Sequence, residues 1–378
     1  MRSPGSPPQW TPPYVLPQLK ADSGPRFIDQ NADRYPWSPL EPLVRAVLEM
    51  HPDFCFGELD IITDRSPLRK LFAFAINESE DFQFCIQFIG KTALFVRTEK
   101  RTRDEISLGD FQGYRQAFED AYTKVASSAQ GSTSHHRIVK YSFGEFRLLV
   151  RSAIDAYLND FAKIPSQKID AQDEEEDEVK SLINPMRATA LDTAPPSAET
   201  TPAPGLKIVR SGCNIPHAAS AELTTRAKHG RNPFFLSQKM PDLWISQTPH
   251  LIKAAYQNAG TDRARAQSRQ ARVAEFVEIE ILSVKEELVK WTAENEKTVS
   301  RFLTVLRQVV DSARILKAAC LVSYQKDGDS LLVRKATDEM MSVLPEELHR
   351  KWPANHGETE DSQQLEQPSS NESHEEKV

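Results

Sequence analysis

Apolar residues follow two kinds of spacing along the chain, and each kind predicts a different secondary structure. Short runs that are apolar, or that alternate with polar residues, predict strands, because successive side chains of a strand point to opposite faces. The predicted strands cover residues 59–63, 82–88, 92–97, 137–143, 145–151, 206–210, 219–225, 273–282, 320–324 and 331–334. Gly90, Lys91 and Thr92 resemble part of a phosphate-binding loop, but they lie between two strands, so we predict a hairpin turn there.

Elsewhere apolar residues recur at intervals of three and four, which predicts helices with one buried face. The predicted helices cover residues 39–50, 113–126, 243–259 and a long stretch from about 283 to 313. Ser38 and Ser283 each precede a glutamate by three residues, a spacing typical of a capped helix start. Strands and helices are interleaved, so we expect one mixed domain, α/β or α+β, with a central sheet flanked by helices.

Three segments lack these patterns. Residues 1–37 are rich in proline, with six prolines in the first 17 residues, and are predicted to be irregular. Residues 160–205 begin with an acidic run and continue with proline, serine and threonine, so we predict a disordered insertion within the domain. Residues 354–378 are predicted to form a disordered acidic tail, which leaves a domain at residues 38–353.

The overall charge of −7 hides a basic remainder. Residues 165–205 hold 9 acidic and 3 basic residues and residues 354–378 hold 7 and 1, which leaves 43 basic against 38 acidic residues elsewhere. A basic domain between acidic segments suits a polyanionic ligand such as RNA; the alternative is a solvated surface with two solubilising segments. The acidic segments are also candidate contacts for a protein partner.

Composition limits the location and the chemistry further. The four cysteines are scattered, with no pair spaced for zinc, which fits a reducing nuclear or cytoplasmic compartment. No apolar run has the length of a membrane span or a signal peptide, so no membrane partner is expected. The chain has no Ser-His-Asp elbow and no glycine-rich dinucleotide loop.

Two acidic residues lie where predicted strands could bring them together. Asp155 follows the strand at 145–151, and Glu222 lies within the strand at 219–225. Carboxylates at adjacent strands can flank one divalent cation, since Mg²⁺ prefers oxygen ligands. Nucleases of the PD-(D/E)XK type carry such an Asp followed by Glu-x-Lys, but here the lysine position holds Thr224. The alternative is that the acidic candidates are unrelated surface carboxylates.

Further landmarks occur in a fixed order around these two residues. They are Arg65 with Leu68 and Lys70, Gly113-Tyr114 before Phe118-Glu119, Asp155, Glu222-Leu223, and Trp244 with Gln247 before Pro249. Over residues 55–335 this series resembles the DXO-type family of RNA decapping and 5′-end exonucleases, a branch of the PD-(D/E)XK superfamily. It also resembles a fungal group of which some members carry the name geranylgeranyl pyrophosphate synthetase. The resemblance implies a single PD-(D/E)XK-like domain.

The resemblance also implies roles for individual residues. Glu119, Asp155 and Glu222 would hold Mg²⁺ or Mn²⁺, and Asp155 and Glu222 would also act in catalysis. Gln247 matches a glutamine of the catalytic site. Arg65 is expected to shape the RNA channel, although Ser66 replaces the family's glycine.

Substrate contact is also expected from Trp244. Two positions depart from the family: Ala153 replaces a glutamate, and Thr224 replaces the lysine. The lysine would orient water or stabilise developing negative charge, a contribution of ~2.7–4 kcal/mol for one donor.

The resemblance and the two losses together define the expected function. We expect a degenerate or attenuated relative that binds an RNA 5′ end or a nucleotide phosphate with weak or no hydrolysis. The alternative is an active Mg²⁺- or Mn²⁺-dependent RNA 5′-end hydrolase. A prenyl diphosphate synthase, as the fungal name suggests, would need Asp-Asp-x-x-Asp clusters, and the sequence has no Asp-Asp pair.

Overall fold

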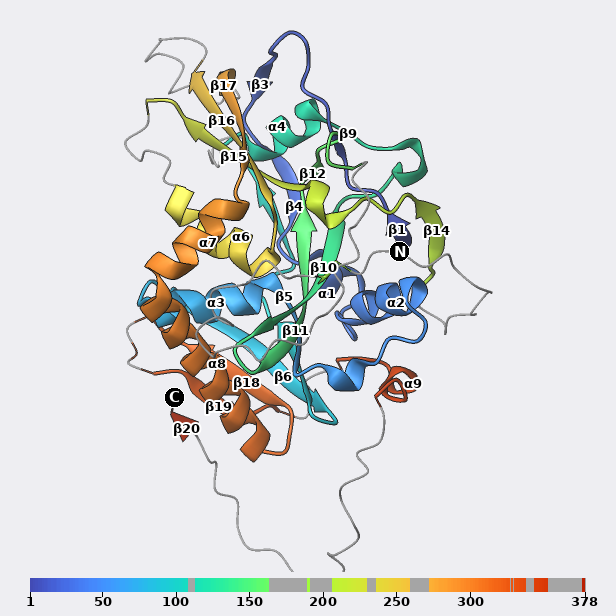
Figure 1. The fold of residues 1–378 in the computed structure, drawn as a ribbon, viewed down its shortest axis with the longest axis vertical. Coiled ribbons are helices and arrows are strands. Elements are labelled where there is room, and N and C mark those ends of the chain that lie inside the picture. The colour runs from blue at the N-terminus through green and yellow to red at the C-terminus, as the bar shows by residue number, and fades with distance from the viewer. Residues whose placement is uncertain are drawn as a thin grey trace, which may run out of the picture.

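The computed structural model describes most of the chain outside the predicted insertion and tail (Figure 1). The described residues are 1–107, 113–162, 189–190, 206–229, 236–258, 272–326, 328, 330–337, 343–352 and 376–377. The predicted disorder of 160–205 and 354–378 falls largely outside these ranges and stays a prediction. Strands and helices are mixed along the described chain, which confirms the predicted fold class.

Most strands belong to two sheets. The first has the order β13 (Thr189–Ala190), β10 (His135–Phe143), β11 (Phe146–Ile154), β5 (Ile61–Asp64), β7 (Thr92–Arg97), β6 (Phe82–Ile89), β18 (Cys320–Tyr324), β19 (Leu332–Lys335) and β20 (Glu376–Lys377). The second has the order β3 (Gln18–Lys20), β17 (Val273–Ser283), β16 (His250–Asn258), β15 (Ser220–Ala227), β12 (Ala156–Tyr157), β2 (Gln9–Trp10) and β9 (Thr123–Lys124). Both contain parallel and antiparallel pairs, as predicted for a mixed sheet. Residues 90–91 form the β6–β7 hairpin turn, as predicted.

The chain passes from one sheet to the other at a single acidic residue. β11 ends at Ile154 in the first sheet, and β12 begins at Ala156 in the second, where it pairs with β15. Asp155 therefore lies at the junction, directly beside the strand that carries Glu222. The fold itself brings together two residues that are separated by the 160–205 insertion in the sequence.

Helices cover both faces of the first sheet (Figure 1). On one face lie α3 (Arg65–Ala75), α6 (Met240–Ser246), α7 (Lys285–Glu294) and α8 (Glu296–Ile315). Their apolar residues, such as Leu71 and Phe302, pack with Phe84 and Phe95 of the sheet. α2 (Glu41–Met50) and α9 (Glu346–His349) contribute to the core on the other face. This arrangement confirms a central sheet flanked by helices and fixes α3 and α6 against each other.

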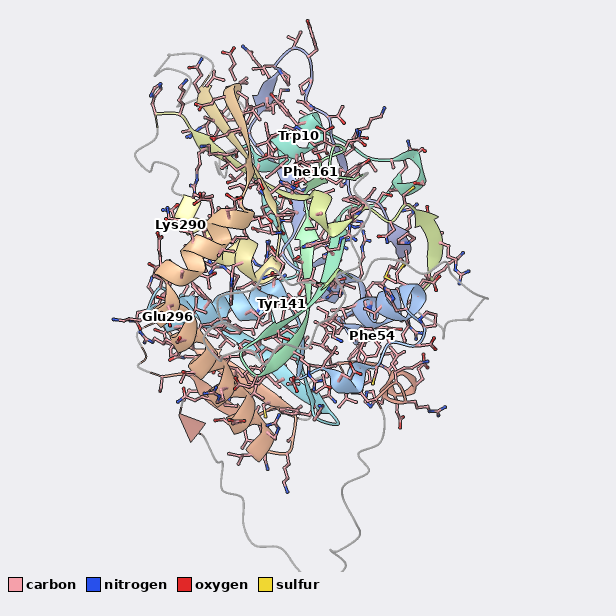
Figure 2. The ribbon with its side chains drawn as sticks, in the orientation of Figure 1. Trp10, Phe54, Tyr141, Phe161, Lys290 and Glu296 are labelled. Carbon is pink, nitrogen blue, oxygen red and sulfur yellow. The ribbon has the colours of Figure 1, made fainter. Side chains whose placement is uncertain are left out.

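A third hydrophobic core lies between α4 (Arg115–Tyr122) and the second sheet. Phe118 and Tyr122 of α4 pack against Phe276 of β17, with ring centroids 4.6 and 6.0 Å apart. Trp10, labelled at the top of Figure 2, stacks on Tyr122 from the N-terminal segment. Burial of these rings fixes the helix whose polar side faces Asp155 and Glu222.

The N-terminal segment is more regular than the sequence predicted. Residues 1–37, expected to be irregular, contain β1 (Arg2–Gly5), β2, β3, β4 (Gly24–Phe27) and α1 (Gln30–Arg34). β1 pairs with β14 (Val209–Gly212) and β4 with β8 (Arg103–Ile106), so these strands join later parts of the chain. Only β1 and β4 of these strands contain proline, and each belongs to a two-stranded sheet, where a missing N–H donor costs little.

The predicted helix at 243–259 is wrong. α6 ends at Ser246, Gln247 adopts a left-handed conformation with φ of 54°, and His250–Asn258 forms β16 between β15 and β17. Pro249 disfavours helical geometry at Thr248. Apolar residues at 251, 252, 254, 255 and 256 fit helical spacing as well as a strand, so the spacing alone did not separate the two. The other predicted strands are present with shifted ends. The long helix predicted from about 283 to 313 is divided at Asn295 into α7 and α8, and the helix predicted to end near 126 ends at Tyr122.

The remaining short elements are 3-10 turns. They are η1 (Phe56–Glu58), η2 (Ser127–Ala129), η3 (His217–Ala219) and η4 (Leu236–Gln238). Among the helices of the described ranges, none combines the length and the apolar character needed to cross a lipid bilayer.

Candidate functional site

Asp155 is held at the junction of the sheets by a backbone donor and by an arginine. The residue is 5% exposed. Its Oδ2 atom accepts a hydrogen bond from the N–H of Leu223 at 2.8 Å, so β15 fixes the carboxylate in place. Nη2 of Arg115 lies 2.7 Å from each carboxylate oxygen. Asp155 is therefore a buried, ion-paired carboxylate.

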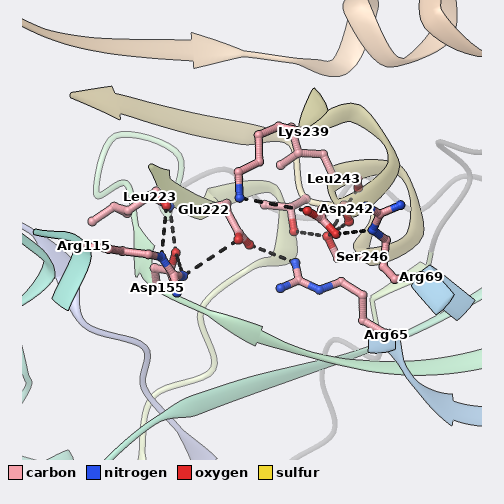
Figure 3. A network of polar contacts seen from close by, with 11 residues as sticks. Arg65, Arg69, Arg115, Asp155, Glu222, Leu223, Lys239, Asp242, Leu243 and Ser246 are labelled. Atoms are coloured by element: carbon pink, nitrogen blue, oxygen red, sulfur yellow. Dashed lines mark hydrogen bonds and ion pairs between the residues drawn. The ribbon is translucent and has the colours of Figure 1, made fainter. Parts of the chain in front are cut away.

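Glu222 lies beside it and is paired with a second arginine (Figure 3). It is 3% exposed on β15, and its Oε2 atom accepts a hydrogen bond from Nη1 of Arg65 at 3.0 Å. Nη2 of Arg115 lies 3.9 Å from its other oxygen. We call Arg65, Arg115, Asp155 and Glu222 the carboxylate–arginine cluster.

Arg115 bridges the two carboxylates from the solvent side. It is the first residue of α4, and its side chain is 51% exposed, whereas those of Asp155 and Glu222 are 7% and 3% exposed. Its Nε atom also donates to the carbonyl of Leu223 at 3.4 Å. The guanidinium thus covers two carboxylates that have little other access to water.

Glu119 lies one helical turn after Arg115 on the same helix, where side chains four residues apart are neighbours. Burial, reinforced by the negative charge of Asp155, raises the pKa of Glu119 to about 8. Its carboxyl group is therefore mostly protonated at neutral pH. The spacing from Arg115 places the third predicted acidic residue on the side of α4 that carries Arg115, and the charge of Asp155 acts on it there.

The two paired carboxylates respond differently to their surroundings. Burial and the charge of Glu222 raise the pKa of Asp155, although Arg115 opposes them. Burial also acts on Glu222, but Arg65, Arg115 and Lys239 outweigh it and hold the pKa of Glu222 below its ordinary value. Glu222 is therefore ionised at neutral pH. Asp155 and Glu222 are both buried, so the alternative of unrelated surface carboxylates does not apply to them.

The three carboxyl groups have the oxygen chemistry that Mg²⁺ and Mn²⁺ prefer, but their arrangement does not fit a resident ion. Two guanidinium groups already balance the charges of Asp155 and Glu222. In the part of the chain that the structure describes, no three His, Cys, Asp or Glu side chains are grouped as metal ligands. A divalent cation would have to displace Arg115.

Lys239 brings an ammonium group to the cluster from another element. It directly precedes α6, and Figure 3 shows its side chain reaching toward Glu222 and Asp242. Its Nζ atom lies 4.0 Å from Asp242, which also forms an ion pair with Arg69 at 2.6 Å. An ammonium thus approaches Glu222 although the lysine expected at position 224 is absent.

The two substituted positions keep the geometry of their strands. Thr224 lies two residues after Glu222 on β15, so both side chains point to the same face, and it is 5% exposed. Ala153 is exposed near the end of β11, opposite His136. A lysine and a glutamate at these positions would approach the cluster from the second and the first sheet, respectively.

Gln247 and Trp244 are buried and make their contacts with other residues than those of the carboxylate–arginine cluster. Trp244 is 2% exposed and packs edge-on against Phe143 at 5.0 Å between ring centroids, within the first sheet's core. Gln247 ends α6, and its side-chain amide donates to the carbonyl of Trp244. The structure therefore places Trp244 in the core, away from the face where a substrate would meet Arg65.

Arg115 and Lys239 were missed by the sequence interpretation. Arg115 follows Gly113-Tyr114 directly, and Lys239 precedes Met240-Pro241, whose proline is typical of a helix start. Both signals place the residues near helix N-termini. Neither signal reveals the carboxylate that each side chain meets, because those partners are distant in sequence.

A buried histidine next to Gln247 gives the fold a predicted acid sensitivity. Burial and Arg137 lower the pKa of His217 to about 4, and its Nε2 atom lies 2.6 Å from the carbonyl oxygen of Gln247. An unfolded histidine has a pKa of about 6.5, so acid protonates the unfolded chain before it protonates the folded one. The stability that comes from the neutral, buried His217 is therefore complete above pH 6.5. The free energy of unfolding falls by about 3 kcal/mol as the pH falls toward 4. Chemical denaturation at pH 7 and pH 4.5 measures the loss.

The matched variant for this prediction is His217→Gln, which keeps a side-chain N–H donor but does not titrate. Its free energy of unfolding is expected to fall less steeply between pH 7 and pH 4.5. An identical pH dependence in both proteins would show that His217 does not contribute to it.

Comparison with known proteins adds a family and a fold. The family model described as "Domain of unknown function (DUF8563)" matches residues 1–352. No curated protein matches the chain. The Rai1 structure of Scheffersomyces stipitis matches with a TM-score of 0.52 at 12% identity, over 92% of this chain and 90% of that one.

Two further solved structures of this type match with lower scores. Candida albicans Rai1, solved in complex with pU5 and Mn²⁺, has a TM-score of 0.46 at 10% identity, with 92% of this chain and 98% of that chain covered. Dxo1 of K. lactis, in complex with manganese, has a TM-score of 0.43 at 10% identity, with 83% of this chain and 76% of that chain covered. The resemblance to the DXO-type family is confirmed as a shared fold, on the S. stipitis structure.

Proposed function

The chain belongs to the DUF8563 family and has the Rai1 fold, and from this premise we propose that it binds an RNA 5′ end or a nucleotide phosphate, with weak or no hydrolysis. The observation that carries the proposal is the gathering of Arg65, Arg115 and Lys239 around two buried carboxylates. A DXO-like role in recognising RNA 5′ ends agrees with the fold.

Cationic side chains explain how a phosphate would be recognised. Guanidinium and ammonium groups donate charge-assisted hydrogen bonds to phosphate oxygens, and arginine can do so with two donors at once. Arg115 uses Nη2 on Asp155 and keeps half of its side chain exposed. A phosphate approaching from solvent would therefore meet Arg115 first, with Arg65 and Lys239 beside it.

Weak hydrolysis follows from the residues that replace the family's catalytic groups. Thr224 offers a hydroxyl but no charge, and Ala153 offers no carboxylate. The loss of one donor that stabilises the transition state costs ~2.7–4 kcal/mol, or about a hundredfold to a thousandfold in rate. Lys239 approaches Glu222 from the side of α6, whereas a lysine at position 224 would approach from β15. Lys239 can therefore bind the ligand's phosphate but does not occupy the position of the missing lysine.

One observation favours the alternative of an active hydrolase. Asp155 and Glu222 both lie near Nη2 of Arg115, and Glu119 follows Arg115 by one turn of α4, which supports a shared acidic site. If active, the enzyme would use Mg²⁺ or Mn²⁺, which would supply charge neutralisation and an activated water. The chain's own residues would then orient the phosphate through Arg65 and Lys239, while Asp155 and Glu222 would stay fixed by β15.

The test compares a 5′-monophosphorylated oligoribonucleotide with its 5′-hydroxyl form. We expect salt-sensitive binding that favours the 5′ phosphate, and little product after incubation with Mg²⁺ or Mn²⁺. Lys239→Ala is expected to weaken binding of the phosphorylated form about tenfold, because one charge-assisted contact contributes ~1.5 kcal/mol. Fluorescence anisotropy measures the affinity, and gel analysis of the products measures turnover.

Lys290→Ala is the matched control. Lys290 lies on the outer side of α7 with 66% of its side chain exposed (Figure 2), so its loss should leave the affinity unchanged. Equal binding of the two oligonucleotides would contradict phosphate recognition. Rapid release of 5′ nucleotides by the unmodified protein would instead support the hydrolase alternative.

A further inference from the structure

We infer that Arg115 is the resident cation of this site: its guanidinium occupies the place between Asp155 and Glu222 that a divalent ion would need, and its removal converts the site into a metal-binding one. The inference rests on the proposed function only for the location of the ligand site. It adds a form of regulation to the proposed function: the side chain of Arg115 and a metal ion compete for the same two carboxylates.

The distances support a bridging position for Arg115. One nitrogen, Nη2, lies 2.7 Å from both oxygens of Asp155 and 3.9 Å from the nearer oxygen of Glu222. An ion shared by the two carboxylates would have to lie near this nitrogen. A Mg²⁺ or Mn²⁺ ion bound there would also face the positive charge of Arg115 at close range, so the two cations exclude each other.

Charge balance leads to the same conclusion. Asp155 and Glu222 together carry at most two negative charges, and Arg115 and Arg65 supply two positive ones at hydrogen-bond distance. Arg65 has a side chain that is only 22% exposed, whereas that of Arg115 is 51% exposed. Arg115 is therefore the more exposed of the two arginines, and its guanidinium can turn toward water when a metal ion takes over the charge balance of the two carboxylates.

Because Arg115 lies at the start of a helix, its side chain can leave Asp155 without a change in the surrounding structure. It is the first residue of α4, whose apolar side is fixed by Phe118 and Tyr122 in the core. Rotation of the side chain away from Asp155 moves no backbone. Leu223 would continue to donate to Asp155, so the carboxylate keeps its orientation without the arginine.

The experiment measures metal binding by the full-length chain in the absence of RNA. Isothermal titration calorimetry and thermal unfolding with MnCl₂ compare the unmodified protein with Arg115→Gln, which keeps a polar side chain without the charge. We expect Arg115→Gln to bind Mn²⁺ at least tenfold more tightly than the unmodified protein and to gain thermal stability with added Mn²⁺. Arg115→Lys, which keeps a positive charge, should remain as insensitive as the unmodified protein.

Two results would overturn the inference. One is equal Mn²⁺ affinity in the unmodified protein, Arg115→Gln and Arg115→Lys. The other is a stoichiometric metal in the purified unmodified protein, measured by mass spectrometry, with a loss of thermal stability on chelation; this second measurement needs no variant to fold. Failure of oligonucleotide binding would contradict the proposed function while leaving the Mn²⁺ result intact, so the two failures are distinguishable.

Discussion

A chain that carries Ala153→Glu, Thr224→Lys and Arg115→Gln is expected to cleave 5′-phosphorylated RNA in Mn²⁺ about 100-fold faster than the unmodified protein. Thr224 shares the face of β15 with Glu222, so a lysine there can reach the same phosphate. Ala153 is exposed, so a glutamate fits without repacking. One donor aimed at developing negative charge contributes about a hundredfold or more in rate. Gel analysis of initial rates gives the comparison.

The matched control replaces the new lysine with an uncharged side chain of similar length. A chain with Ala153→Glu, Thr224→Met and Arg115→Gln should bind Mn²⁺ yet cleave as slowly as the unmodified protein. Thr224 is buried, so circular dichroism should verify that each variant is folded. Equal rates in the lysine and methionine variants would show that the substituted positions do not limit hydrolysis.

Arg151→Ala is expected to lower the free energy of unfolding by ~3–5 kcal/mol, because it leaves a buried carboxylate without its partner. Arg151 is 3% exposed on β11. Its Nε and Nη2 atoms donate to the two oxygens of Asp64 at 2.6 and 3.0 Å, and Nη2 also donates to the carbonyl of Pro39 at 3.1 Å. Urea denaturation at neutral pH measures the loss.

The physical reason is visible in the pKa of the partner. Burial acts against ionisation of Asp64, yet Arg151 outweighs it and holds the pKa of Asp64 below its ordinary value. The pair therefore stabilises the fold above the pKa of an unfolded aspartate, and this contribution is lost as pH falls through the folded pKa. At neutral pH the full effect of Arg151→Ala is expected.

Two control variants test whether the loss of stability depends on burial of the ion pair. Arg307→Ala removes an exposed ion pair with Glu145, in which both side chains are almost half exposed, and should cost at most about 1 kcal/mol. Adding Asp64→Asn to Arg151→Ala removes the unpaired charge and should recover part of the loss. A loss for Arg151→Ala no larger than that for Arg307→Ala would contradict the prediction.

The spacing of apolar residues predicted most of the sheet strands, because short apolar runs and alternating runs both leave a pattern in the sequence. β7 and β11 are buried almost continuously and have short apolar runs, whereas much of β17 alternates. β6, β7, β10, β11 and β17 lie close to their predicted ranges. β16 was missed because its burial alternates only from Ile252 to Gln257, and Ala254 and Ala255 are both apolar, so the sequence hides that alternation. Pro249 was the local signal against a continuous helix.

The site was predictable only in part. Resemblance identified the three carboxyl groups, and the structure brings Asp155 and Glu222 together at the sheet junction. The pairing of Arg115 with Asp155, 40 residues away, and of Arg65 with Glu222, 157 residues away, left no local pattern. Ion pairs between distant segments depend on the register of β12 with β15, which no single-sequence pattern specifies.

The junction at Asp155 also has a mechanical consequence. Arg65 begins a helix packed on the first sheet, whereas its partner Glu222 belongs to a strand of the second sheet. Their ion pair therefore connects the two sheets at the junction. A change in the angle between the two sheets would lengthen this ion pair. A phosphate bound by Arg65 and Arg115 together would restrict the motion of the two sheets relative to each other. It would thereby make the whole molecule more rigid, although it contacts only a few side chains.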